Sequence, residues 1–190
     1  MRQAKVPAEQ EFRRLLAVAA QSAHAARNRA ALMLSYYAGL RVGEIAALSI
    51  VDVYDQGNQV RDQIMLRAEI TKTKEARVVF VGDKLRKELE RYRDSWTSTQ
   101  PKPARALLRS QKGAAFSANS LCQLLGRLYD EAGIQQGSSH SGRRWFITKL
   151  AHSGVSPKVI MTLAGHKNLT TTQRYIEVND AMMVAAVDRL

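Results

Sequence analysis

The sequence predicts an α+β fold that is mostly α-helical and contains one small antiparallel β-sheet. Apolar residues recur at helical spacing along most of the chain, beginning with Phe12, Leu15 and Ala19. β-prone runs occur at 63–70 and 76–81, on either side of a polar tip at 71–75, which is the pattern of a hairpin. With 190 residues the chain can bury a proper core within a single domain.

In the first half of the chain, the helical pattern begins around Phe12 and is followed by two further segments, at 25–37 and 42–48. Gly39 suits the C-terminal end of the second of these helices, because glycine readily adopts the left-handed conformation found there. A turn at 52–58 leads into the predicted hairpin. A charged amphipathic helix then begins at Gly82-Asp83 and runs to about Trp96.

The second half begins with a loop at 97–105 that contains Pro101 and Pro103. Ser117 or Asn119 is expected to cap a helix that ends near Ala132. The remaining predicted helices cover 141–152, a segment from Ser156-Pro157 to about Gly165, 170–175 and 181–190.

The charge balance indicates a phosphate-rich partner. Lysine and arginine number 29 against 17 acidic residues, which leaves a formal net charge of +12 and a pI near 10.2. Residues 134–176 contain no Asp or Glu but hold six lysines and arginines and three of the four histidines. Such a stretch favours an anion-binding site over a generally solvated surface, and double-stranded DNA is the expected partner.

The cysteine content and hydropathy exclude several classes of protein. Cys122 is the only cysteine, so neither an intrachain disulfide nor a cysteine-based zinc site can form. The N-terminus lacks the apolar stretch of a signal peptide, and no segment has 18 uninterrupted apolar residues. We therefore expect a cytoplasmic protein that does not enter the membrane.

One ordered set of side chains would suffice to break a phosphodiester without a metal or other cofactor. Two guanidiniums can hold the phosphate oxygens, a phenol can attack phosphorus, and a lysine and a histidine can move protons. A phenol has a pKa near ~10, so nearby positive charge or a base must help to remove its proton. The set comprises Arg41, Lys72, His140, Arg143, His166 and Tyr175.

The order of these residues and the sequence motifs around them closely resemble those of the catalytic domain of the tyrosine recombinases, also called the phage integrase family. The resemblance runs from about Phe12 to the C-terminus. It is carried by Ala38-Gly-Leu-Arg41-Val-Gly-Glu44, His140-x-x-Arg143, Ala164-Gly-His166 and Arg174-Tyr175. It implies the fold of that catalytic domain and a reaction that cleaves and rejoins DNA through a 3′-phosphotyrosine intermediate.

The resemblance also implies a role for each residue. Arg41 and Arg143 would clamp the phosphate, His140 would act as general base, His166 would hydrogen-bond the phosphate, and Tyr175 would be the nucleophile. Glu44 would support the site by orienting other groups. Lys72 in the hairpin tip would protonate the departing 5′ oxygen, with Lys74 as the competing candidate. The expected DNA-binding residues are Arg41, Lys72, Lys74, Arg143, Arg144, Lys167 and Arg174.

We expect residues 1–190 to form a single catalytic domain. Typical members of the family carry a separate N-terminal helical domain that clamps the far side of the DNA, and we expect no such domain within residues 1–190. A minimal recombinase, a catalytic fragment and a truncated gene are the open explanations. The tail at 179–190 is expected to form a helix that either folds back on its own domain or exchanges with a neighbouring protomer. A monomer in solution and a tetramer on synapsed DNA sites are the corresponding assemblies.

Two other functions remain open at this point. Type IB topoisomerases use related chemistry to relax supercoiled DNA without choosing a site. A DNA-binding module that kept the fold would need no nucleophile at Tyr175. The presence of the complete residue set favours a site-specific recombinase, whether it performs integration, excision, inversion or resolution.

Overall fold

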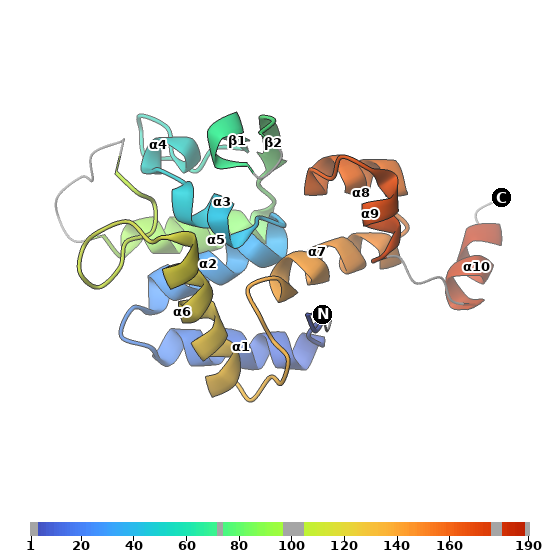
Figure 1. The fold of residues 1–190 in the computed structure, drawn as a ribbon, viewed down its shortest axis with the longest axis horizontal. Helices are drawn as coiled ribbons and strands as arrows, with labels where there is room; N and C mark the ends of the chain where they lie inside the picture. Colours follow the sequence, from blue (N-terminus) through green and yellow to red (C-terminus); the bar gives the residue numbers. More distant parts are fainter. Residues whose placement is uncertain (1–3, 72–73, 97–104, 176–179, 189–190) are drawn as a thin grey trace.

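The computed structural model describes residues 4–71, 74–96, 105–175 and 180–188 of the chain (Figure 1). It confirms a mostly helical fold with a small antiparallel sheet. Within those residues the helices are α1 (Glu9–Gln21), α2 (Ala25–Tyr37), α3 (Val42–Ala47), α4 (Ile50–Val53), α5 (Asp83–Asp94), α6 (Ala118–Glu131), α7 (Ser141–His152), α8 (Pro157–Ala164), α9 (Leu169–Gln173) and α10 (Asp180–Val187).

Helix α2 lies at the centre of the molecule and packs against α1, α5 and α7, while α3 packs against α6. The apolar side chains of α2 are buried over nearly the whole length of the helix, because neighbouring helices cover it on several sides. The main core includes the fully buried Leu15, Leu34 and Leu125. The main core supports the segment that follows α2 and contains Arg41, the first residue of the candidate site.

A second, smaller core joins α7 to α8. It consists of Ile147, Ala151, Ile160 and Ala164, and Tyr175 packs against its edge. Figure 1 shows α7, α8 and α9 together at one side of the larger body, with α10 farther out. Leu40 of the main core precedes Arg41, whereas Ala164 of the second core leads to His166.

The sheet is a two-stranded antiparallel hairpin, β1 (Gln63–Leu66) paired with β2 (Arg77–Phe80). Gln63 faces Phe80 and Leu66 faces Arg77 in the ladder. The predicted strand at 63–70 was too long, because Ala68–Ile70 forms a 3₁₀ turn. Buried Thr71 follows this turn, and its hydroxyl donates to the backbone of Ala68 or Glu75 and accepts from the Glu75 N–H, which fixes the base of the hairpin tip.

The predicted turn at 52–58 was wrong at its start, because α4 occupies Ile50–Val53. Asp52 accepts hydrogen bonds from the backbone N–H and the hydroxyl of Ser49, at 2.7 and 2.6 Å, so the two residues close the N-terminal turn of this short helix. A turn does follow, at 55–58, where Asn58 adopts a positive φ of 58°.

The helix ends follow the predicted capping signals. Ser117 caps α6, and Ser156 caps α8 with Pro157 in the first turn. Gly39 and Gly165 follow α2 and α8, each with φ of +62°, a conformation that costs glycine little. No helix within the described part of the chain is both long and apolar enough to cross a membrane.

Candidate active site

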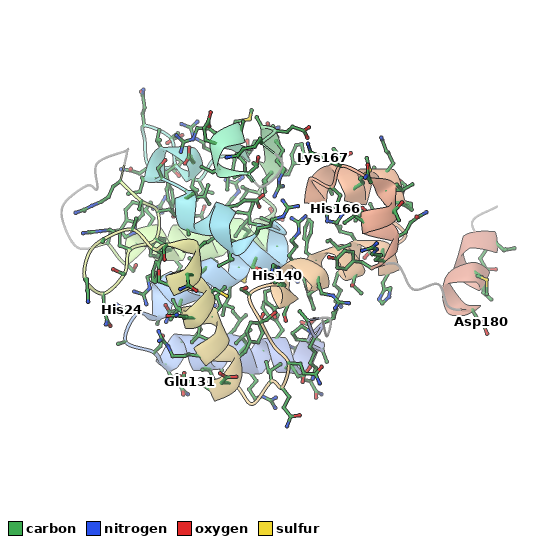
Figure 2. All side chains as sticks on the ribbon, viewed as in Figure 1. His24, Glu131, His140, His166, Lys167 and Asp180 are labelled. Carbon is green, nitrogen blue, oxygen red and sulfur yellow. The ribbon has the colours of Figure 1, made fainter. Side chains whose placement is uncertain are left out.

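A cavity of about 430 Å³ opens where the N-terminal ends of α3 and α7 meet the C-terminal end of α8 and α9. Figure 2 places His140 at the start of α7 and His166 just after α8. The cavity brings together five of the six residues predicted to be catalytic. Its lining consists of Ala4, Arg41, His140, Arg143, Arg144, His166, Thr171, Arg174 and Tyr175.

Arg41 is the N-cap residue of α3, directly after the Gly39-Leu40 break, and Glu44 lies one turn later. The Glu44 carboxylate is 1% exposed and accepts from the Arg41 guanidinium at 2.9 Å and from the Arg41 backbone N–H at 2.8 Å. Burial alone would raise the pKa of Glu44. The positive charge of Arg77, the Arg41 backbone N–H, and the charges of Arg41 and Arg143 outweigh burial and hold that pKa below its ordinary value.

Arg143 lies in the first turn of α7 and is almost fully buried. Its guanidinium donates to the carbonyl of Gly39 at 2.6 Å and to the carbonyl of Ala164 at 2.5 Å, so backbone from both cores aims it into the cavity. Burial, together with the charges of Arg41 and Arg77, lowers the pKa of Arg143 to about 9. A negatively charged ligand in the cavity would stabilise the charged Arg143 guanidinium and raise its pKa.

His166 follows the left-handed Gly165, and its Nδ1 lies 2.9 Å from the hydroxyl of the buried Thr172. Burial lowers its pKa to about 4, with further lowering by the charges of Arg143, Arg41 and Arg77. The imidazole is therefore neutral near pH 7. A neutral imidazole can donate one hydrogen bond to an anion while accepting another from Thr172.

Tyr175 follows α9, and its ring stacks on His166 with 5.9 Å between centroids. The guanidinium of Arg144 lies 5.5 Å from the centre of the Tyr175 ring. Arg144 also donates to the carbonyl of Ala4, which brings the N-terminal segment to the edge of the cavity. The phenol is thus held between a histidine and an arginine, beside the two guanidiniums predicted to bind phosphate.

Of the predicted lysines, the structure describes Lys74 and Lys167. Lys72 falls outside the described residues. Lys74 is exposed at the tip, with φ of 56°, and does not line the cavity. Lys167 is exposed as well and forms an ion pair with Glu75 at 3.1 Å, which brings the loop after α8 against the hairpin.

Two residues that contact the site, Arg77 and Thr172, are not among the functional residues predicted from the sequence. The predicted strand at 76–81 includes Arg77 but gives no indication of its contacts, because its guanidinium donates to Glu44 at 2.8 Å and to the carbonyl of Leu163 at 3.0 Å. Thr172 was one of three consecutive threonines, and only its contact with His166 sets it apart. The Arg77 contacts join β2 to α3 and α8, segments that the sequence pattern does not place side by side.

The electrostatics of the cavity favour an anion. The guanidiniums of Arg41 and Arg77 contact the Glu44 carboxylate, and the charge of Arg143 also acts on it. Among the described side chains, this leaves an excess of positive charge in a half-buried space. Forked guanidinium donors match the geometry of phosphate oxygens. Within the described ranges, no group of three or more His, Cys, Asp or Glu side chains could hold a metal ion.

Known proteins resemble this chain in both sequence and fold. The Phage integrase family matches residues 5–182. Tyrosine recombinase XerC of Syntrophus aciditrophicus is 32% identical over 174 residues, covering 86% of this chain and 53% of the relative. The crystal structure of XerA recombinase superposes with a TM-score of 0.79 at 26% identity, over all of this chain and 66% of that one.

The structure of XerH site-specific recombinase bound to its difH substrate, a pre-cleavage complex, superposes with a TM-score of 0.66 at 22% identity. The superposition covers 98% of this chain and 55% of XerH. At this identity the comparison shows only that the two proteins share a fold. The chain thus spans between half and two thirds of the length of these relatives. The match over residues 5–182, together with the cavity that gathers the motif residues, establishes that the chain belongs to the phage integrase family.

Proposed function

We propose that this chain is the catalytic domain of a tyrosine site-specific recombinase, which cleaves and rejoins DNA strands through a 3′-phosphotyrosine intermediate. The observation that carries the proposal is the shared cavity of Arg41, His140, Arg143, His166 and Tyr175. The recombinases among its relatives support site-specific exchange over supercoil relaxation or passive DNA binding.

In the cleavage step, Arg41 and Arg143 hold the non-bridging oxygens of the scissile phosphate, and the neutral His166 donates a further hydrogen bond. The Tyr175 hydroxyl attacks phosphorus while His140 accepts its proton. The bond between phosphorus and the 5′ oxygen breaks, and that oxygen takes a proton from Lys72, a role that rests on the family resemblance. Because charge develops on the phosphoryl oxygens, fixed guanidiniums stabilise the transition state more than the ground state.

Rejoining reverses these events. The 5′ hydroxyl of another strand attacks the phosphotyrosine, the new phosphodiester forms, and Tyr175 recovers its proton. The energy of the original phosphodiester is kept in the protein–DNA bond, so exchange needs no nucleotide triphosphate. Double-stranded DNA is the proposed substrate, held at the cavity by Arg144 and Arg174 and beside it by Lys74 and Lys167. XerH, which shares the fold, binds its difH substrate.

Residues 1–190 would act as one catalytic domain in the cytoplasm, where bacterial DNA lies. We propose a monomer in solution and a tetramer on two synapsed sites, with α10 exchanged between neighbouring protomers. Val184 and Val187 on α10 are 59% and 66% exposed, and Figure 1 shows α10 standing away from the other helices. Exposed apolar side chains such as these gain stability when a second chain buries them.

Trapping of the covalent step tests the proposal. The protein is incubated with nicked duplexes of randomised core sequence, and protein-linked DNA is sought on a denaturing gel, with Tyr175→Phe as the control. Adducts with the wild type alone support the proposal. DNA binding without any adduct, or equal adducts with Tyr175→Phe, would overturn it. Relaxation of plasmids lacking any preferred site would point to topoisomerase activity instead.

A further inference from the structure

The C-terminal end of α8 gathers three arginines from three different elements. The carbonyl of Leu163 accepts from Arg77 of β2, that of Ala164 from Arg143 of α7, and that of Gly165 from Arg41 at the start of α3. The last carbonyls of a helix lack partners within the helix and carry its negative dipole end, so they attract cations. This helix end therefore sets the relative positions of the cationic side chains.

Arg77 differs from the other two arginines because it does not line the cavity. Its side chain is 10% exposed, and it joins two groups that do position the cavity, the Glu44 carboxylate and the end of α8. Its aliphatic portion packs against Gly165, where an added Cβ would lie 2.5 Å from Arg77 Cδ. Arg77 thereby occupies the space that a side chain at position 165 would need.

The cost of burying Arg77 indicates that stability alone does not explain it. Burial lowers the pKa of Arg77, and its buried Nε has no hydrogen-bond partner among the residues that the structure describes. A buried ion pair often contributes little net stability compared with apolar side chains of similar volume. Arg77 instead connects two groups that position catalytic residues. On one side Glu44 holds Arg41, and on the other Gly165 precedes His166.

We infer that Arg77 is a positioning residue that fixes Arg41 through Glu44 and His166 through the end of α8, and that it ties both to the β1–β2 hairpin. The inference rests on the proposed recombinase chemistry. Lysine cannot replace arginine fully, because a single ammonium cannot span the Glu44 carboxylate and the Leu163 carbonyl as a planar fork does. The ion pair of Lys167 with Glu75 is a second, exposed link between the hairpin and the segment after α8.

A matched control exists elsewhere in the molecule. Glu88 on α5 is a buried carboxylate held by Arg91 three residues away and by the distant Arg29 on α2, just as Glu44 is held by Arg41 and Arg77. Arg29 also reaches a backbone carbonyl, that of Leu16 at 3.4 Å. Arg29→Met therefore removes an equivalent ion pair without touching the cavity.

The test compares single-turnover adduct formation on a nicked duplex at saturating DNA for the wild type, Arg77→Met, Arg77→Lys and Arg29→Met. Thermal unfolding of each variant is measured alongside. A small displacement of catalytic groups can cost about 10²-fold in rate, so we expect Arg77→Met to lower the rate constant about ten- to hundred-fold. Arg77→Lys should recover part of the loss, and Arg29→Met should cleave like the wild type despite a comparable loss of stability.

Cleavage by folded Arg77→Met at the wild-type rate overturns the inference and leaves the proposed function intact. If Arg77→Met does not fold, Arg77→Lys decides, and a wild-type rate for that variant overturns the inference as well. If the wild type forms no adduct, the proposed function fails, and titration of His166 by NMR still tests the linkage. Loss of the Arg77 charge should raise the His166 pKa, whereas Arg29→Met should leave it unchanged; equal titration in all variants overturns the linkage.

Discussion

The hydroxyl of Thr172 lies 2.9 Å from Nδ1 of His166, and the threonine is completely buried. A hydroxyl that donates to Nδ1 leaves the proton of the neutral ring on Nε2. Because the His166 side chain lines the cavity, this tautomer turns the imidazole into a hydrogen-bond donor for phosphate. Thr172 thus orients the histidine although it does not itself line the cavity.

Replacement of Thr172 by valine should slow DNA cleavage, and the variant should keep the fold of the wild type. Loss of one hydrogen bond costs about 1 kcal/mol, which corresponds to a roughly five- to tenfold lower rate constant for adduct formation. Thr172→Ser keeps the hydroxyl and should cleave nearly as fast as the wild type. Equal rates for the valine and serine variants would contradict the proposed orienting role.

The depressed pKa of His166 predicts a specific pH dependence of stability. In the unfolded chain the imidazole titrates near its ordinary pKa of 6.5, whereas in the folded protein it titrates near 4. Between these values the unfolded state binds a proton that the folded state does not, so the free energy of unfolding should fall as pH decreases from 6.5 to 4. Urea unfolding at pH 7 and pH 5 should show a larger loss for the wild type than for His166→Gln. Equal losses would show that His166 is not the titrating group.

The predictions from the sequence succeeded where a signal is local. Gly39 after α2 and Ser156-Pro157 before α8 marked helix ends through their own backbone preferences. The motif residues were expected to converge, and five of the six line one cavity. Short elements were harder, because four residues of α4 give no periodicity, although Ser49 with Asp52 is a capping pattern that could have identified it.

The remaining features depend on contacts between distant segments. Residues 67–70 follow a β-prone run, but Ala68–Ile70 turns away as a 3₁₀ segment ahead of the hairpin tip. Arg77 acquires its place only because β2 meets the end of α8, 86 positions away from Arg77 along the chain. Such long-range packing is invisible to patterns of spacing and propensity.

Glu44→Gln should destabilise the protein strongly. The substitution keeps the size of the side chain but leaves Arg41 and Arg77 without their shared negative charge. Removal of one partner from a buried charge network typically costs about 3–5 kcal/mol. Chemical denaturation measures the loss, and the exposed Glu131→Gln serves as a control that should change stability by less than about 0.5 kcal/mol. A similarly small effect at Glu44 would refute the structural role of this carboxylate.

Substitution by alanine should change the stability of the protein in opposite directions at two glycines. At Gly39 the φ of +62° and a Cβ position 2.5 Å from the Phe146 ring predict a loss of more than about 1 kcal/mol. Gly126 in α6 has open space around its Cβ position, so alanine there should stabilise the helix by about 0.5–1 kcal/mol. Gly39→Ala should also slow DNA cleavage, because the Gly39 carbonyl holds Arg143. Thermal unfolding shifts of the same sign for both variants would be inconsistent with this geometry.

Identification of the residue and the DNA end joined in the covalent adduct tests the central claim most directly. The trapped complex is digested with protease and nuclease, and the linked peptide is sequenced by mass spectrometry. The account predicts a single modified residue, Tyr175, carrying the 3′ phosphate of the cleaved strand. Linkage to another residue, or to a 5′ phosphate, would contradict it.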